Sequence, residues 1–419
     1  MILKLIRDLN FKENRLTLVK KSLVIFFLIG IVMSYNLWTN DRNFPLFPVF
    51  DNLVFSKLWG WAIFFAQLIL LISVFFSNKK RLIFLIYVIF CFSLIQDQLR
   101  LQPWVYLYLL AFLPFLFITK DEDNYLGISY LQCLVIGVYI WSGIHKFNLN
   151  FIDIVVENIS VNSFRVYDVS IINFIKSFGY VIPVFEILTG LFLWFSATRR
   201  IGILMAIFTH LFVLYYLGPY SMDSNYIVYP WNIEMIILVI LLFYKTGDKI
   251  SFGIERRFIK NVFRLALILV LGLPVFNFIG LWDHYLSFSF YSGKAPDLYI
   301  LTKNPTELEH KYFLPIEGME GGEIISVVNW ASMELNVPFY PESRIFKSFI
   351  ELYEKDVKGN DFVFIESSMP LYERQIYNTY GSKRKKKEVS KFFFLTFDNP
   401  IYLDTTSMKV LKQYSHLPD

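Results

Sequence analysis

The sequence predicts an all-α polytopic membrane bundle of about nine transmembrane helices with a small C-terminal α+β extramembrane domain. Three observations support this fold class. Hydrophobic residues make up 55% and charged residues 18% of the 419, whereas a soluble domain is roughly half apolar and a quarter charged. The apolar residues form long runs within residues 1–283. The 45 Phe, 26 Tyr and 9 Trp residues are typical of helices that contact lipid tails and headgroups.

Each predicted span is an apolar run close to the length needed to cross a bilayer as a helix, about 17 to 25 residues. The runs are 22–38, 58–76, 82–96, 104–119, 129–147, 178–196, 201–217, 229–244 and 262–283, of which the third and eighth are short. The first run follows a basic stretch, as in a signal peptide. It is long for such a segment and no small-residue cleavage site follows, so we expect it to be retained.

Basic residues in alternate loops predict the orientation. They follow the second run at 79–81, the sixth at Arg199 and Arg200, and the eighth between 245 and 260. Cytoplasmic loops carry an excess of Lys and Arg. We therefore expect the N-terminus inside, the C-terminal domain outside, and a location in the bacterial cytoplasmic (inner) membrane.

The sequence pattern changes after Asp283, so we divide the chain into a transmembrane domain, 1–283, and an extracytoplasmic α+β domain, 284–419. Short runs rich in β-branched and aromatic residues predict strands. These runs are 323–330, 361–368 and 391–398. Residues 341–357 place apolar side chains on one helical face and predict a helix. The basic run 383–387 predicts a solvated loop, with a headgroup or an anionic partner as the alternative contact.

Four ionisable residues inside the spans are candidates for a site in the outer half of the membrane. They are Lys146 at the outer end of the fifth run, Glu186 about two turns into the sixth, His210 near the middle of the seventh, and Glu234 near the outer end of the eighth. Such groups are costly in lipid and usually face the bundle interior. Asp97 is a further candidate. We expect Lys146, Glu186 and His210 to approach one another.

Each of these residues also has a structural explanation. Lys146 at a helix end extends its ammonium to the interface, Glu186 bonds a neighbouring helix, and His210 is a packing residue. The alternative is that Lys146 belongs to a functional site. Tyr139 and Ser142 support it, because they share a helical face with Lys146. Burial disfavours a charged lysine, whereas a nearby carboxylate favours it. Lys146 can therefore act as a base only where burial dominates.

Three segments carry a resemblance to a known family. YIWSGIHKFNLNF (139–151), VFEILTGLFLWFSATRRIGILMAIFTHLF (184–212) and QDQLRLQPWVYLYLLAF (96–112) resemble the HTTM domain, the membrane domain of vitamin K-dependent gamma-carboxylases and their bacterial relatives. The similarity covers roughly residues 20–245 and is clearest over 130–217.

The resemblance implies that Lys146 is the base that deprotonates a quinone-type molecule, and that Glu186 and His210 match an acidic position and a histidine of the family. A quinone is the implied cofactor. His145 and Trp104 depart from the family's pattern, and the C-terminal domain is much shorter than the carboxylases' lumenal portion. Carboxylation of protein glutamate is therefore not expected.

Two classes of function remain open at this point. The first is an enzyme that acts on a quinone-like or other lipid-soluble molecule, with Lys146 as base. The alternative is a non-catalytic scaffold, or a DoxX-like redox-associated protein, that binds lipid or an extracytoplasmic protein partner. A transporter is less favoured because no inverted repeat is visible. The modest net charge of +5 lies in loops, which argues against nucleic acid, and neither Cys91 nor Cys133 has the spacing of a metal site.

Overall fold

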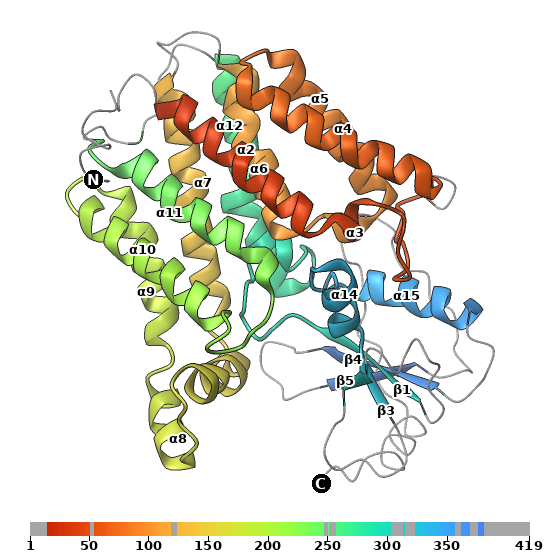
Figure 1. Ribbon diagram of the computed structural model, residues 1–419. Coiled ribbons are helices and arrows are strands. Elements are labelled where there is room, and N and C mark those ends of the chain that lie inside the picture. Colours follow the sequence, from red (N-terminus) through yellow and green to blue (C-terminus); the bar gives the residue numbers. More distant parts are fainter. Residues whose placement is uncertain are drawn as a thin grey trace.

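The computed structural model describes residues 15–50, 54–118, 124–246, 250, 257–302, 313–314, 323–356, 362–368 and 376–380. Helices dominate up to residue 279, and a small sheet with two helices follows (Figure 1).

Seven described helical segments are long and apolar enough to cross a membrane. They are α2 (Arg15–Met33), α4 (Lys57–Phe76), α7 (Asn124–His145), α8 with α9 (Val169–Ser177, Val181–Trp194), α10 (Arg199–Tyr216), η6 with α11 (Tyr226–Val228, Tyr229–Phe243), and α12 with η7 and η8 (Arg257–Leu267, Ile268–Gly272, Leu273–Ile279). The shorter α5 (Lys80–Gln96) and α6 (Pro103–Phe117) coincide with the third and fourth predicted runs. The predicted helical membrane bundle is confirmed, with seven segments that meet the length requirement.

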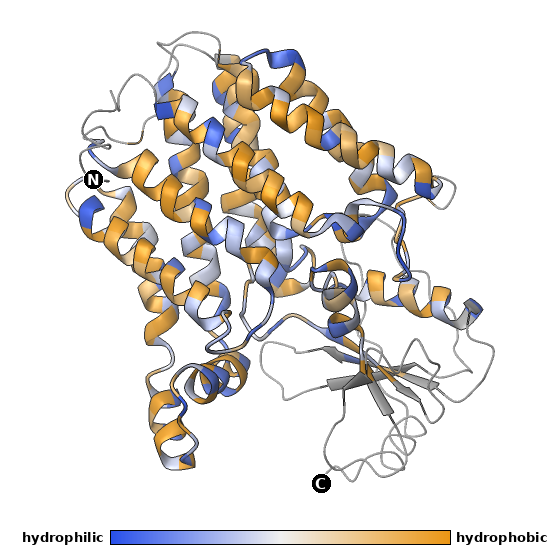
Figure 2. Ribbon diagram, in the orientation of Figure 1, coloured by the Kyte–Doolittle hydropathy of each residue, from blue (hydrophilic) through white to orange (hydrophobic). Residues whose placement is uncertain are grey.

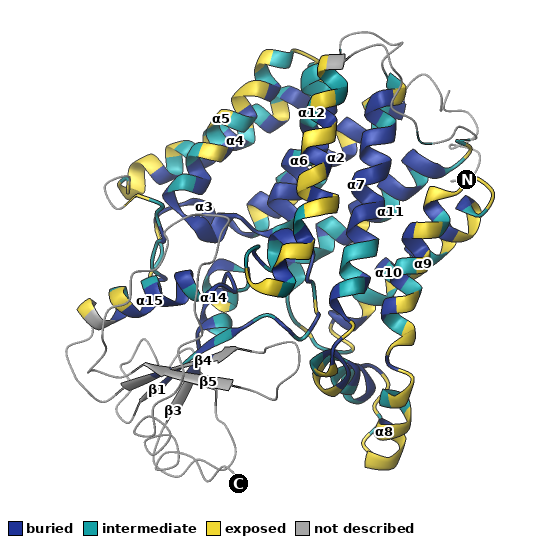
Figure 3. Cartoon of the chain, turned by 180° about the vertical axis from the view of Figure 1, so that it is seen from behind, coloured by how far each residue is buried: buried dark blue, intermediate teal, exposed yellow. Residues whose placement is uncertain are grey.

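The outward faces of the helices remain apolar, as a bilayer requires. Phe76 is 82% exposed, Leu204 68% and Phe208 62%. Figure 2 shows hydrophobic residues along the full length of these helices, and Figure 3 shows that α7 is largely buried at the centre. An exposed surface of this kind is stable against lipid tails and unfavourable in water. The chain is therefore an integral membrane protein.

Small residues let α7 and α9 approach closely. A Cβ added at Gly143 would lie 2.8 Å from the carbonyl oxygen of Pro183, and one added at Gly190 would lie 2.8 Å from Ile140 Cγ1. Glycine at such positions permits tight helix contacts in membranes. The contact places the end of α7 beside the second turn of α9.

The C-terminal part contains an antiparallel five-stranded sheet in the order β2-β3-β1-β4-β5. The strands are β1 (Asp297–Thr302), β2 (Phe313–Leu314), β3 (Glu323–Ser326), β4 (Phe362–Ser368) and β5 (Ile376–Tyr380), and the helices are α14 (Val327–Leu335) and α15 (Ser343–Asp356). In the central register, Tyr299 of β1 faces Ser326 of β3 and Ile365 of β4.

The structure corrects part of the predicted secondary structure here. The predicted helix 341–357 is α15, and the predicted strand 361–368 is β4. The predicted strand 323–330 is wrong after Ser326, because the Ser326 hydroxyl accepts a hydrogen bond from the backbone N–H of Asn329 (3.2 Å) and caps α14. The predicted strand 391–398 and the basic run 383–387 lie outside the described residues.

One apolar core connects the bundle to the C-terminal part. Phe44, in the loop after α3 (Tyr35–Trp38), lies 5.2 Å from the Trp330 ring and 5.9 Å from the Phe349 ring, measured between centroids. The neighbouring Phe47 lies 5.7 Å from Phe339. These rings belong to the same buried cluster as residues of α2 and α7. The first loop of the bundle is thus covered by α14 and α15.

Candidate functional site

Lys146 and Glu186 form a buried ion pair at the end of α7. The Lys146 Nζ lies 2.8 Å from Glu186 Oε2 on α9, and the two side chains are only 7% and 11% exposed. The same ammonium donates to the Ser142 hydroxyl (2.6 Å) and to the Ser142 carbonyl oxygen (3.3 Å). The negative end of the α7 dipole adds to the stabilisation of this charge. All three N–H groups of Lys146 therefore have acceptors.

His210 belongs to a second chain of hydrogen bonds that starts on the same helix. Its Nε2 lies 2.7 Å from the Tyr139 hydroxyl of α7, and its Nδ1 lies 2.8 Å from Asn232 Oδ1 of α11. Because the Asn232 amide nitrogen donates to the Val228 carbonyl oxygen, its oxygen accepts from His210 Nδ1–H. Nε2 is then left to accept from Tyr139. This chain joins α7, α10 and α11.

The structure thus brings Lys146 and Glu186 into direct contact and ties His210 to α7 through Tyr139. The hydrogen bonds of His210 go to Tyr139 and Asn232. Sequence reasoning missed Asn232, a neutral residue whose only signal was its place two residues before Glu234. Among the described residues, no group of three or more His, Cys, Asp or Glu side chains is arranged to hold a metal ion.

Glu234 lies on another side of α11 and bonds the first helix of the bundle. Its Oε1 accepts a hydrogen bond from the Ser22 hydroxyl of α2 at 3.0 Å, and its side chain is fully buried. Glu234, a candidate for the site, therefore makes its contact with α2 inside the bundle and is not part of the Lys146–Glu186 pair.

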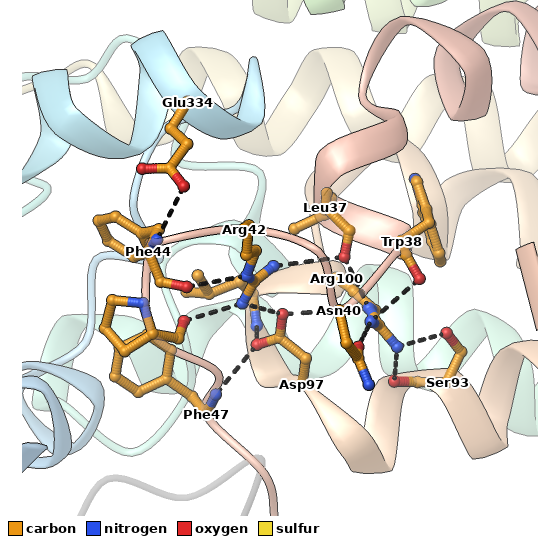
Figure 4. Close-up of polar contacts among 12 residues, drawn as sticks. Leu37, Trp38, Asn40, Arg42, Phe44, Phe47, Ser93, Asp97, Arg100 and Glu334 are labelled. Carbon is orange, nitrogen blue, oxygen red and sulfur yellow. Dashed lines mark hydrogen bonds and ion pairs between the residues drawn. The ribbon is translucent and has the colours of Figure 1, made fainter. Parts of the chain in front are cut away.

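Asp97 is part of a separate ionic network rather than of the Lys146 site (Figure 4). Its Oδ2 lies 2.6 Å from Arg42 and 3.9 Å from Arg100. Arg100 donates to the Leu37 carbonyl oxygen (2.8 Å) and the Ser93 hydroxyl (2.8 Å). Its remaining acceptors are Ser93 O, Trp38 O and Asn40 Oδ1. The network fixes the first loop of the bundle against the end of α5.

A further buried ion pair joins the segment just after the last membrane helix, which ends at Ile279, to the C-terminal part. Arg344, in the first turn of α15, donates to both Asp283 carboxylate oxygens at 2.7 and 2.6 Å. The Tyr340 hydroxyl donates to the same carboxylate at 2.8 Å. Beside it, Glu342 accepts from the backbone N–H of His284 at 2.8 Å. This paired arrangement with two N–H···O bonds is the strongest geometry for an arginine and a carboxylate.

The pKa of Asp283 predicts a pH dependence of stability. Burial, with the neighbouring Glu342 carboxylate, raises this pKa from 3.8 to about 6, against the opposing effect of Arg344. Because the folded-state pKa is raised, the contribution of this group is fully present below about pH 4 and is lost as the pH rises through about 6. A shift of two units corresponds to about 3 kcal/mol.

The measurement is thermal unfolding of wild type and Asp283→Asn in detergent from about pH 4 to about pH 7.5. The stability of wild type relative to the variant is expected to fall across this range. A difference that stays constant with pH would show that Asp283 binds no proton near pH 6.

Residues 124–223 match the family model described as methylamine utilisation protein MauE. The match covers about a quarter of the chain and includes Lys146, Glu186 and His210. No curated protein and no solved structure matches the chain.

The MauE match corrects the predicted relation to HTTM domains and gamma-carboxylases. The matched family is a different one, and it covers the segment where the resemblance was clearest. Glycine, an acidic residue and paired basic residues at these spacings serve close helix packing, ion pairing and loop orientation in helical membrane bundles generally. The quinone cofactor and the role of Lys146 as base lose the support that the resemblance had lent them.

Proposed function

We propose that the MauE-like segment of this membrane protein binds a lipid-soluble molecule at the outer half of the bilayer, next to the Lys146–Glu186 pair. The ion pair carries the proposal. An ionisable pair inside a membrane bundle is expensive to keep and typically marks a substrate or proton pathway. Here both charges lie in the matched segment, and Asn148, two residues after Lys146, donates to the Ser292 carbonyl oxygen just before the C-terminal sheet.

The chemistry of the pair favours a hydrogen-bonding group on the molecule, such as a carbonyl or a hydroxyl. An incoming oxygen would replace Ser142 as an acceptor for Lys146, while Glu186 keeps its own hydrogen bond from the Lys146 Nζ. In this arrangement Lys146 is a hydrogen-bond donor through all three of its N–H groups. We therefore assign to the pair the binding and orientation of the molecule through a hydrogen bond from Lys146.

A second candidate is a non-catalytic scaffold that presents its outer part to a protein partner. The observation that favours it is the Tyr139–His210–Asn232 chain, whose ring, amide and hydroxyl groups bond one another. A closed chain of this kind locks helices together without a ligand. In this alternative the ion pair also serves only to fix α7 against α9.

A charge-matched set of variants separates the two candidates. Lys146→Met leaves Glu186 without its partner and is expected to cost about 1–3 kcal/mol. The double variant Lys146→Met/Glu186→Leu removes both charges and should recover most of that stability. We expect mass spectrometry to find a lipid-soluble molecule on wild type and to find it lost from the stable double variant.

Retention of the molecule by the double variant, or its absence from wild type, would leave the scaffold as the better account. Lys176→Met is the control, because Lys176 pairs with Asp153 and Glu157 in the connection between α7 and α9, at a distance from the site.

A role in methylamine utilisation is tested separately, by growth on methylamine of a strain that lacks its own MauE and carries this chain.

We further propose that the nine predicted runs all cross the membrane, with the N-terminus inside and the C-terminal part outside. Single cysteines at positions 251 and 368, in a background without Cys91 and Cys133, test this orientation. An impermeant thiol reagent on intact cells should label position 368 and spare position 251. The opposite labelling pattern would reverse the orientation.

A further inference from the structure

Two buried nitrogen-bearing side chains near the Lys146 site are poorly satisfied by the described part of the chain. They are Lys294, whose residue is 6% exposed, and His145, which is fully buried. Among the described residues, the Lys294 Nζ has no hydrogen-bond partner, and the ring nitrogens of His145 make no hydrogen bond of good geometry beyond their approach to the Pro274 backbone. Buried polar groups are nearly always satisfied, and each exception in a native structure calls for an explanation such as a bound ion.

Both side chains meet on one aromatic ring. The Lys294 Nζ lies 4.3 Å from the centre of the Phe278 ring, and the His145 imidazole stacks on the same ring at 4.7 Å with an interplanar angle of 18°. A cation over an aromatic face gains some stabilisation. The ring faces offer no acceptor in line with the remaining N–H groups, so the ammonium keeps a large uncompensated desolvation cost.

The local backbone holds Lys294 in this position. Gly293 has φ +72°, and a Cβ there would lie 2.8 Å from the carbonyl carbon of Asn150. The Asn148 amide donates to the Ser292 carbonyl oxygen at 2.9 Å, and the Ser292 hydroxyl accepts from the Lys294 backbone N–H at 3.3 Å. A glycine with this φ and this contact allows the turn to lie flat against the residues after α7. The inward position of the lysine is therefore fixed by several contacts.

We propose that Lys294 and His145 bind a phosphate group at the end of α7. Lysine binds phosphate as a point charge, and a neutral imidazole adds one N–H donor. Lys146, at the same end of α7, has Glu186 as its anion, whereas no carboxylate of the described residues pairs with Lys294. Burial lowers the Lys294 pKa to about 8, and an anion bound beside the ammonium would oppose that effect. This site is separate from the proposed function, which uses other side chains.

Two sources can supply the phosphate: a phospholipid headgroup, or a free phosphate or phosphorylated small molecule. The full chain, purified in detergent, is probed with inorganic phosphate, with phosphatidylglycerol and with phosphatidylcholine. The readouts are the midpoint of thermal unfolding and the mass of retained ligand. Stabilisation by inorganic phosphate supports a free anion, and stabilisation only by a phospholipid supports a headgroup. Wild type that responds to none of the three probes overturns the proposal.

The variants test whether these two side chains hold the ligand. Lys294→Met should weaken the binding of the effective probe about tenfold to a hundredfold. His145→Phe keeps the stack on Phe278 and removes both nitrogens, and it should weaken the same probe. Lys176→Met, the control, should bind as wild type does. If Lys294→Met fails to fold, His145→Phe decides, and unchanged binding in that variant overturns the proposal.

Discussion

Replacing Arg344 with Met is expected to lower the free energy of unfolding by about 3–5 kcal/mol, because it leaves the Asp283 carboxylate buried without its partner. Arg344 is 5% exposed and Asp283 is fully buried. The two hydrogen bonds of 2.7 and 2.6 Å are lost together. The measurement is the midpoint of thermal unfolding in detergent, at a pH of about 7.5, which is above the Asp283 pKa of about 6 in wild type.

The control for this prediction is the double variant Arg344→Met/Asp283→Asn, which removes both charges. It should be more stable than Arg344→Met alone, since the uncompensated carboxylate is gone. A double variant as unstable as the single one would show that the packing of the Arg344 side chain, rather than its charge, holds α15 to the bundle.

Arg100→Met is expected to have an effect of similar size, about 3–5 kcal/mol. The guanidinium is 1% exposed and donates to acceptors on three segments, among them the Leu37 and Trp38 carbonyl oxygens and the Ser93 hydroxyl. These acceptors lose their donor while the Asp97 carboxylate keeps only Arg42 as a cationic partner. Thermal unfolding and protein yield from membranes are the measurements.

The matched control is Arg81→Met on α5, the helix that also carries Ser93. Arg81 is exposed, so its replacement should change stability by less than about 0.5 kcal/mol. Arg100→Lys is a second comparison, because a single ammonium cannot reach the five acceptors of the guanidinium. An Arg100→Met variant as stable as the Arg81→Met control would contradict the role assigned to this network.

The membrane helices were predictable because bilayer thickness fixes the length of an apolar run, and that length is visible locally. Each predicted run coincides with a helix. The order of strands in the sheet was harder to predict from the sequence, because the pairing of β1 with β3 and β4 joins residues far apart in the chain. The predicted strand at 327–330 was wrong because the local preference and the capping contact disagree. Val327 and Val328 favour a strand, whereas the hydrogen bond to the Ser326 hydroxyl starts a helix.

The candidate site was predictable in part for a similar physical reason. Charged residues in apolar runs stand out, which identified Lys146 and Glu186, and their opposite charges fit the observed pair. Partners that are neutral or distant left little signal. Asn232 was missed because it is neutral. The Asp283–Arg344 pair was missed because its members lie 61 positions apart in the sequence. The family resemblance was wrong because short motifs in membrane helices are shared by unrelated bundles.

The first loop of the bundle is synthesised long before α14, the helix that it contacts in the folded protein. The backbone N–H of Phe44 bonds the Glu334 carboxylate at 2.9 Å across 290 residues of chain. At about 5–20 residues per second, the ribosome needs on the order of 15 to 60 s to supply that partner. During this interval Phe44 and Phe47 lack the rings that later cover them. The first loop therefore reaches its final packing only after the last third of the chain has begun to be made.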